Sequence, residues 1–381
     1  MKNDLKITFF SNFLLHHQTP FCEAMVKLLG DNFRFVATEP VPEERLGMGY
    51  HDYTDVPYAV NAYENKEKYE KAMKLGVESD VVIIGSAPDV FIEKRLYENK
   101  LTFRYRERYF KDGRWRILDP RVFRARYKAD FKNRSKDLYM LCASAYTAPD
   151  CRFIHSYKNK MYRWGYFPEV KKYSDIEDLI KTKKQSSILW VGRLLELKHP
   201  EDAINLAEKL KQNGYDFNMQ IIGQGEKENE IRSEISRKNL SDVVSLKGFM
   251  SPEDVRCEME KADIFLFTSD RNEGWGAVLN ESMNSACAVV ANKEIGSVPY
   301  LIKNGENGLI YKRYDKDDLF IKVKSLLDDE NKKHKIQLGA YNTMANVWNA
   351  DVAAERLINL IESIIDNRDC IYKDGPCSKE I

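Results

Sequence analysis

Residues 186–225, SSILWVGRLLELKHPEDAINLAEKLKQNGYDFNMQIIGQG, decide the fold class. The stretch opens with an apolar run at 186–193, continues with an amphipathic helical pattern at 200–214, and closes with a second apolar run at 217–225. Strands with continuous rather than alternating apolar residues are typical of parallel sheets buried on both faces. A helix between them is the crossover that parallel strands require. The stretch therefore predicts one βαβ unit of a doubly wound α/β domain.

The same pattern extends along the chain in both directions. Further apolar runs predict strands, at 243–249, 262–269 and 287–293 in the second half and at 5–13, 32–40, 80–88, 100–108 and 138–146 in the first. Helical patterns lie between them, which predicts two Rossmann-like domains. The predicted division has five parts: a first domain 1–168, a polar linker 169–185, a second domain 186–350, a helix 351–367 that could cross back to the first domain, and a polar tail 368–381.

The composition is that of a soluble globular protein, with 43% hydrophobic and 31% charged residues among 381. No apolar run approaches the ~20 residues that cross a bilayer, and the first residues lack the pattern of a signal peptide. The seven cysteines contain no C-x-x-C pair, which is typical of a reducing cytosol and argues against a structural zinc. We therefore expect a cytoplasmic protein.

One segment is strongly basic. Residues 94–136 contain sixteen Lys+Arg and five Asp+Glu, a local charge of +11 in a chain whose total is +1, so the remainder carries −10. Aromatic residues are interleaved with these charges, including Trp115, Phe123 and Tyr127. An anionic membrane surface fits this pattern and is favoured. A solvated, salt-bridged face is the main alternative, and nucleic acid binding is disfavoured.

Two carboxylates mark the stretch FTSDRNEGWGAVLNESM, residues 267–283. Glu273 lies in a predicted turn after a strand, and Glu281 lies on a helix expected to begin near Ala277. Ionised carboxylates accept hydrogen bonds from several hydroxyl groups, as sugars and ribose present them. Alternatively, both acids simply favour the start of a helix.

Cations and glycines follow two strands of the same domain. Arg193 and Lys198, five residues apart after the first strand, could clamp a diphosphate, or could be solvated loop charges. Gly223 and Gly225 fit either a turn that approaches a ligand or an ordinary turn at a strand end.

Together these motifs resemble a known family. VGRLLELKHP, IIGQGE, LKGF, FTSDRNEGWGAVLNESM and NGENGLIY, in this order, are similar to the C-terminal half of the retaining glycosyltransferases of family four. The resemblance implies the GT-B fold, an α/β architecture of two doubly wound Rossmann-like domains that face each other across a cleft. It also implies that Glu273 contacts the donor sugar, that Glu281 contacts the ribose, and that Arg193 and Lys198 hold the diphosphate.

The resemblance assigns further residues on the donor side. Backbone groups of the turn would line the phosphate and sugar, and the segment that ends the third strand of this domain would lie near the base: Gly274, Trp275, Gly276 and Ala277 for the turn, and Lys247 and Phe249 for the base.

The acceptor side is expected in the first domain. His16 and His17 follow its first strand and could bind the acceptor or move a proton, although a structural role is an alternative. Arg106 and Glu107 end another strand, where the family often carries a group near the reacting carbon, and Glu107 is a candidate for the catalytic centre.

The sequence thus predicts a metal-independent enzyme without a cofactor. It would move a hexosyl-type sugar, with retention, from a nucleotide-diphosphate sugar to a lipid-linked or polysaccharide acceptor in capsule, exopolysaccharide or O-antigen synthesis. UDP is favoured over GDP, and the enzyme would lie at the inner face of the cell membrane. The alternatives are an inverting GT-B transferase, a nucleotide-sugar epimerase, and a non-enzymatic protein that binds membranes or nucleic acids through 94–136.

Overall fold

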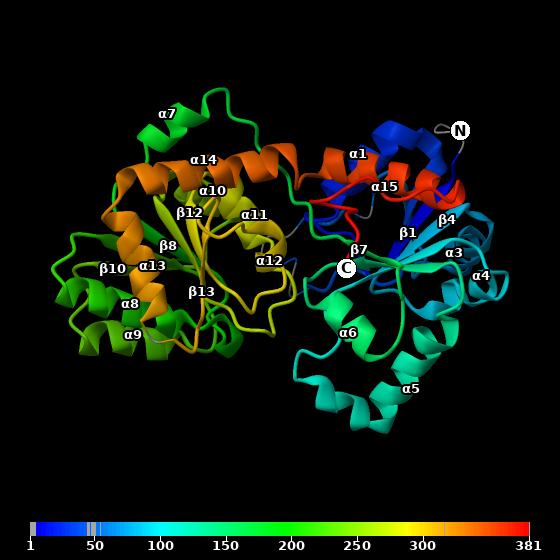
Figure 1. Ribbon diagram of the computed structural model, residues 1–381, viewed down its shortest axis with the longest axis horizontal. Coiled ribbons are helices and arrows are strands. Elements are labelled where there is room, and N and C mark those ends of the chain that lie inside the picture. The colour runs from blue at the N-terminus through cyan, green and yellow to red at the C-terminus, as the bar shows by residue number, and fades with distance from the viewer. Residues whose placement is uncertain (1–4, 44–45, 47–50, 54, 316, 381) are drawn as a thin grey trace. The chain divides into compact units, whose positions relative to one another are not determined.

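The computed structural model describes residues 5–43, 46, 51–53, 55–315 and 317–380. The chain divides into two compact units (Figure 1): the first comprises 1–169 and 348–381, and the second comprises 170–347. The segment 170–185, which the sequence analysis treats as a linker, belongs to the second unit and contains a short helix.

The first unit is built on a seven-stranded sheet in the order β3-β2-β1-β4-β5-β6-β7, in which every pair of neighbours is parallel. Its strands are β1 (Ile7–Ser11), β2 (Phe33–Ala37), β3 (Ala59–Asn61), β4 (Val81–Ile84), β5 (Thr102–Arg106), β6 (Leu138–Cys142) and β7 (Met161–Arg163). Its helices include α1 (Thr19–Leu29), α3 (Lys66–Glu78), α4 (Glu93–Tyr97), α5 (Pro120–Ala129), α6 (Thr147–Phe153) and α15 (Ala350–Ile365), with 3₁₀ turns η2 (Asp89–Phe91), η3 (Arg114–Leu118) and η4 (Phe131–Asn133). The five strands predicted for this half are present; β3 and β7, three residues each, were not predicted.

The second unit has a six-stranded sheet in the order β10-β9-β8-β11-β12-β13, again parallel throughout. Its strands are β8 (Ser187–Val191), β9 (Asn218–Ile222), β10 (Val244–Gly248), β11 (Ile264–Phe267), β12 (Ala288–Asn292) and β13 (Leu309–Tyr311). Its helices are α7 (Ile176–Lys181), α8 (Pro200–Gln212), α9 (Glu228–Arg237), α10 (Pro252–Lys261), α11 (Val278–Asn284), α12 (Val298–Leu301), α13 (Asp318–Leu327) and α14 (Glu330–Asn346), with the 3₁₀ turn η5 (Glu196–Lys198).

Continuous apolar strands form the core of each unit, as the sequence pattern predicts. All residues of β4 and β11 are buried, because helices cover both faces of each sheet. In the second unit α8, α9 and α13 pack together on one side, and α10, α11 and α14 lie on the other (Figure 1). In the first unit α15 packs beside α1, so the last long helix of the chain completes the first unit.

Helix α5 is the exception to this packing, because none of its residues is buried. Its C-terminal end is held by Asp130, a buried carboxylate that accepts a hydrogen bond from Arg126 (2.8 Å) and lies 3.7 Å from the buried Arg104 of β5. Tyr157 and Tyr109 donate hydrogen bonds to the same carboxylate (2.6 and 3.1 Å). The cluster fixes α5 to the sheet at one end and leaves its faces open.

No helix of the described residues has the length and apolar character needed to cross a membrane.

We predict that Gly223→Ala destabilises the second unit by about 2–4 kcal/mol, measured as a loss of unfolding free energy in denaturant. Gly223 has φ +139°, and a Cβ atom there would lie 1.9 Å from the carbonyl oxygen of Gly192. Gly214→Ala is the control, because its φ is +75° but no atom lies within 4 Å of the added Cβ, so it should cost only about 1 kcal/mol. Equal losses in the two variants would contradict the packing role of Gly223.

Candidate functional site: the edge of the second sheet

The loops after β8 and β11 meet at the carboxyl edge of the second sheet. These strands are neighbours in the sheet, but the chain continues from β8 to β9 on one side and from β11 to β12 on the other. Such a reversal of strand order is a switch point, and open α/β sheets bind ligands at switch points. The loops are tied together by hydrogen bonds from Thr268 Oγ1 to the carbonyl of Lys198 (2.6 Å) and from the amide of Asp270 to the carbonyl of Leu197 (2.9 Å). Trp190 of β8 donates from Nε1 to Thr268 Oγ1 (2.8 Å), which anchors the junction in the core.

The junction places two predicted site residues in direct contact. Lys198, at the end of η5, forms a short ion pair with Glu273 from the loop after β11. Ser269 donates a hydrogen bond from Oγ to the same carboxylate oxygen (3.0 Å). Both charged side chains are largely shielded from solvent, with exposed fractions of 17% and 13%. The structure thus brings the strand-end lysine and the first acid of the stretch into contact.

Arg193 follows β8 on the same edge and is exposed. Within the part of the chain that the structure describes, its guanidinium has neither an ion-pair partner nor a hydrogen bond. It is therefore a cation available to a ligand, as the diphosphate clamp requires.

Glu281 lies on α11 in a different environment from Glu273. Burial raises the pKa of Glu281 above its ordinary value, and the nearby Arg256 only partly opposes this effect. Arg256 hydrogen-bonds to the backbone carbonyl of Glu281 (3.2 Å), and no described group hydrogen-bonds to the Glu281 carboxylate. A desolvated carboxylate without a partner is costly, and hydroxyl donors from a ligand would satisfy it.

The turn between the two acids is closely packed. Gly276 has φ +77°, and a Cβ there would lie 2.3 Å from the ring of Phe267. The Trp275 side chain is buried and donates from Nε1 to Asn280 (2.9 Å), while its carbonyl accepts a hydrogen bond from Ser297 (2.5 Å). Trp275 is therefore a core residue whose side chain holds the turn in place. The backbone N–H groups of Gly274, Gly276 and Ala277 have no acceptor among the described residues.

The other donor-side residues predicted from the sequence lie on neighbouring strands. Gly223 and Gly225 lie against the backbone of 192–194, where an added Cβ would come within 2.5 Å of a carbonyl oxygen, so their close approach is to protein backbone. Lys247 and Phe249, at the end of β10, are exposed.

Residues 172–343 match the family described as Glycosyl transferases group 1. This match lies within the second unit and covers less than half of the chain. The second unit therefore contains a domain of the glycosyl transferases group 1 type.

Curated relatives are similar to this domain. The amylovoran biosynthesis glycosyltransferase AmsK of Erwinia amylovora is 30% identical over 182 residues, which cover 46% of this chain and 44% of that protein. The N-acetylgalactosamine-N,N'-diacetylbacillosaminyl-diphospho-undecaprenol 4-alpha-N-acetylgalactosaminyltransferase of Campylobacter jejuni is 31% identical over 147 residues, 39% of each protein. The chain thus spans less than half the length of these relatives.

The similarity to solved structures extends over both units. A crystal structure of Anabaena HepE in complex with UDP is similar to 94% of this chain and to all of that chain, with a TM-score of 0.70 and 14% identity. A structure of TarM covers 74% of this chain and 55% of that one, with a TM-score of 0.59 and 16% identity. These are likenesses of fold, and the chain has the two-unit GT-B fold.

In the first unit, three of the residues considered for the acceptor side are linked through a residue that the sequence analysis missed. The ring of His17 stacks on Tyr166 at 4.3 Å, and Tyr166 donates a hydrogen bond to Glu107 (2.8 Å). His16 packs edge-on against His17 at 5.3 Å. Tyr166 lies after β7, far along the chain from both partners, so no local pattern indicates it.

The remaining acceptor-side residue, Arg106, ends β5. Burial lowers the pKa of Arg106, and the nearby Arg104 adds to this effect. No described group forms a hydrogen bond or an ion pair with its guanidinium. Glu107, the next residue, also pairs with Lys111 (2.8 Å).

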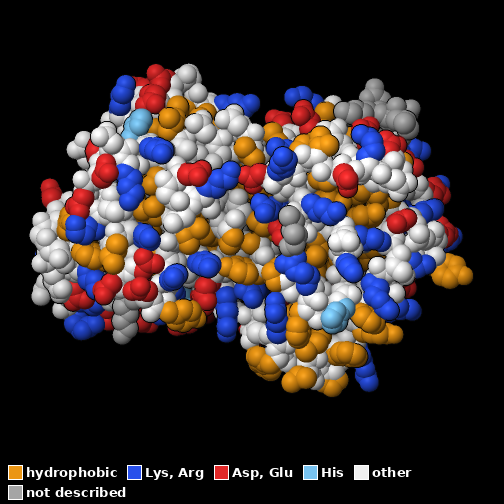
Figure 2. Space-filling view, viewed as in Figure 1, with side chains coloured by type: hydrophobic (Ala, Val, Ile, Leu, Met, Phe, Trp, Pro, Cys, Tyr) orange, Lys and Arg blue, Asp and Glu red, His pale blue; other side chains and the backbone are white. Residues whose placement is uncertain are grey.

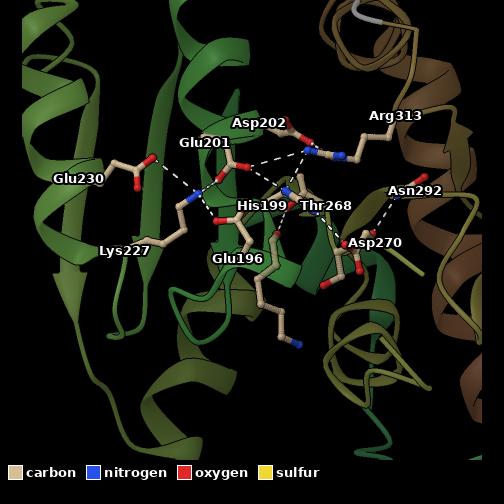
Figure 3. A network of polar contacts seen from close by, with 12 residues as sticks. Glu196, His199, Glu201, Asp202, Lys227, Glu230, Thr268, Asp270, Asn292 and Arg313 are labelled. Atoms are coloured by element: carbon tan, nitrogen blue, oxygen red, sulfur yellow. Dashed lines mark hydrogen bonds and ion pairs between the residues drawn. The ribbon is translucent and has the colours of Figure 1, made fainter. Parts of the chain in front are cut away.

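A polar network surrounds His199, the residue after Lys198 (Figure 3). Glu196, His199 and Glu201 bring ligand-type atoms within 4.8 Å of one another, the only such group found in the described chain. Lys227 already lies 2.9 Å from the Glu196 carboxylate and 3.1 Å from that of Glu201. An ammonium group thus occupies the place where a metal ion would bind the two carboxylates.

We predict that Glu281→Gln raises the melting temperature of the unliganded glycosyltransferase at neutral pH by about 2–4 °C, the equivalent of ~1 kcal/mol in a domain of this size. Because the folded-state pKa of Glu281 is raised, its charge opposes folding above that pKa and ceases to do so as pH falls. The difference from wild type should therefore shrink as the pH is lowered towards ~4. A difference that is independent of pH in thermal unfolding would contradict this interpretation.

Proposed function

We propose that the protein transfers a hexosyl-type sugar, with retention, from a nucleotide-diphosphate sugar to a lipid-linked or saccharide acceptor in cell-surface polysaccharide synthesis. The single observation that carries the proposal is the arrangement at the switch point of the second unit. A shielded Lys198–Glu273 pair lies there in the same loops as Arg193, whose guanidinium has no described partner. The proposal applies to the whole protein, whereas the family match concerns the second unit.

The chemistry requires the leaving diphosphate to be stabilised as its charge develops. Arg193 would hold phosphate oxygens with its planar fork, and Lys198 would add a compact charge. The N–H groups of Gly274, Gly276 and Ala277, which have no acceptor among the described residues, offer further donors. These groups supply positive charge and hydrogen bonds without a metal ion, so we propose a metal-independent reaction without a cofactor.

The two acids would have separate tasks. Glu273 would exchange its contact with Lys198 for hydroxyl groups of the donor sugar once the diphosphate competes for the lysine. Glu281, which lacks a described hydrogen-bond partner, would accept hydroxyl groups of the ribose. Retention is the outcome that the family resemblance implies, and the exposed Phe249 and Lys247 are proposed to lie near the base.

The names of similar proteins support the classes of donor and acceptor. HepE was crystallised with UDP, with UDP and glucose, and with UDP-glucose, which supports a uridine nucleotide. AmsK is named for amylovoran biosynthesis, and the Campylobacter jejuni transferase is named for a diphospho-undecaprenol substrate. The acceptor would approach the carboxyl edge of the first sheet, where Glu107 and His17 are linked through Tyr166 and where Arg106 and His16 lie nearby in the chain.

We expect UDP at about one hundred times its dissociation constant to raise the melting temperature of the wild type by about 5–10 °C. Glu281→Ala should lose most of this shift, because the substitution removes the carboxylate that would accept hydrogen bonds from the ribose hydroxyl groups. Glu253→Ala, an exposed acid on α10, is the matched control and should retain it. GDP and ADP are tested in parallel, and the absence of a shift with all three nucleotides would overturn the proposed donor.

We also propose that the first unit docks on an anionic membrane through η3 and α5. Four large apolar side chains are exposed there: Trp115 (62%), Leu118 (80%), Phe123 (54%) and Tyr127 (48%). Hydrophobic side chains gather over this part of the molecule with Lys and Arg beside them (Figure 2). Phe123 and Tyr127 stack on one face of α5 at 6.2 Å.

Charge complementarity favours lipid as the occupant of this face. Residues 114–136 contain nine Lys+Arg and two Asp+Glu, and one of the two acids is the buried Asp130. Aromatic rings beside cationic side chains suit the boundary between headgroups and acyl chains. The location that follows is the cytoplasmic face of the cell membrane, where a lipid-linked acceptor would be within reach.

The membrane proposal predicts sedimentation with vesicles of phosphatidylcholine and phosphatidylglycerol but not with phosphatidylcholine alone. Phe123→Ser with Tyr127→Ser should reduce binding at least tenfold, because ~3 kcal/mol of apolar burial is lost. Tyr314→Ser, at an aromatic side chain of the second unit that is more exposed (79%), should have no effect. Binding to single-stranded RNA instead of vesicles would favour the nucleic acid alternative, and binding to neither would leave a solvated face.

A further inference from the structure

His199 lies at the junction of the two donor loops and touches both. It directly follows Lys198, is 6% exposed, and has φ +48°. Its Nε2 atom lies 3.2 Å from the Asp270 carboxylate in the loop after β11. Asp270 in turn accepts, through its backbone carbonyl, a hydrogen bond from the amide of Glu273 (3.1 Å). The imidazole therefore bridges the segments that carry Lys198 and Glu273.

The other ring nitrogen has two competing partners. Nδ1 lies 2.8 Å from Glu201 and 2.8 Å from a guanidinium nitrogen of Arg313. Figure 3 shows His199 with Glu201 and Arg313 at one end of the ring and Asp270 at the other. A protonated Nδ1 donates to Glu201, whereas an unprotonated Nδ1 accepts from Arg313. One nitrogen cannot do both, so the two contacts define two states.

The charged form satisfies both carboxylates at once. In that form Nδ1–H donates to Glu201, Nε2–H donates to Asp270, and Arg313 keeps its own ion pair with Asp202 (3.0 Å). In the neutral form Nε2–H still reaches Asp270, but as a weaker, uncharged donor. Glu201 then loses its hydrogen bond from the imidazole and keeps its ion pair with Lys227.

The charges around the ring favour the protonated form. Burial opposes the charge, but the hydrogen bonds to Glu201 and Asp270 outweigh it and raise the pKa of His199 above its ordinary value. Burial also opposes ionisation of Glu201, yet hydrogen bonds from His199 and Lys227 lower its pKa to about 2. The titratable and charged groups on the elements packed around His199 are Glu196 and Lys198 of η5, Glu201 and Asp202 of α8, Lys227 before α9, Asp270 after β11, and Arg313 after β13.

We infer that His199 is a pH-sensitive latch that positions Lys198 and Glu273 for the donor diphosphate. It is a positioning residue, because it touches Asp270 and Glu201 and acts on the donor through the loops. The inference rests on the proposed donor site. Protonated His199 holds the two loops together through a charge-assisted contact, and loss of the proton weakens the link and so weakens donor binding.

The backbone at position 199 makes the side chain testable without disrupting the fold. Glycine and asparagine tolerate the left-handed conformation that φ +48° requires. His199→Asn places a neutral amide near the position of Nδ1 and cannot titrate. His199→Gly removes the side chain altogether. His334→Asn is the control, because His334 of α14 pairs with Glu177 (2.7 Å) and lies outside the network.

The experiment measures the dissociation constant of UDP by calorimetry between about pH 6 and about pH 8.5 for the four proteins. UDP ionises identically in every titration, so differences between proteins report on the protein. Relative to His199→Asn, wild-type affinity should fall by about tenfold as pH rises through the raised pKa of His199. His199→Gly should bind about tenfold more weakly than wild type at the acidic end, and His334→Asn should follow wild type.

A second arm measures melting temperature against pH without nucleotide. The stabilisation from protonated His199 is fully present below ~6.5 and is lost as pH rises through the higher folded-state pKa. Wild type should therefore lose stability over that interval relative to His199→Asn. Identical pH profiles for wild type and His199→Asn in both arms would overturn the latch. If wild type binds none of UDP, GDP and ADP, the proposed donor site is wrong. The melting temperatures alone then show whether protonation of His199 stabilises the contact between the two loops.

Discussion

The ion pair between Lys198 and Glu273 is the interaction on which the proposed donor site depends. For a pair that is largely shielded from solvent, the cost of desolvating both charges offsets much of their attraction, so its importance here is geometric. It joins the two loops that diverge from the switch point, and it keeps a cation and an acid ready in one place without leaving either charge unpaired. The parallel sheet provides this arrangement, because the carboxyl ends of β8 and β11 lie side by side.

Most of the sheet could be predicted from the sequence, because buried parallel strands are continuous apolar runs and each unit repeats the pattern. The strands β3, β7 and β13 escaped prediction because three residues give no periodicity to detect. That Glu273 and Lys198 lie close together could be predicted, because each follows a strand of the same sheet. The contacts of His199 could not be predicted, since its partners come from three separate segments that only the fold brings together.

The glycines show where pattern reasoning stops. A glycine after a strand indicates a close approach, but the sequence does not say what approaches. At Gly223 and Gly276 the structure supplies the answer, a backbone carbonyl in one case and the Phe267 ring in the other. These contacts fix the paths of two loops at the edge of the sheet. A glycine can thus shape a binding site by packing against protein, without touching the ligand.

Two acids of one short stretch have different electrostatic environments, and the fold accounts for the difference. Glu273 lies at the loop junction, where Lys198 and Ser269 satisfy it. Glu281 lies on α11, where burial raises its pKa and no described group hydrogen-bonds to its carboxylate. The paired acid links the two loops through its contacts with Lys198 and Ser269. The unpaired acid carries a desolvation cost, which lowers the stability of the unliganded fold. Hydrogen bonds from hydroxyl groups of a ligand would remove this cost, so the lost stability would be recovered on binding.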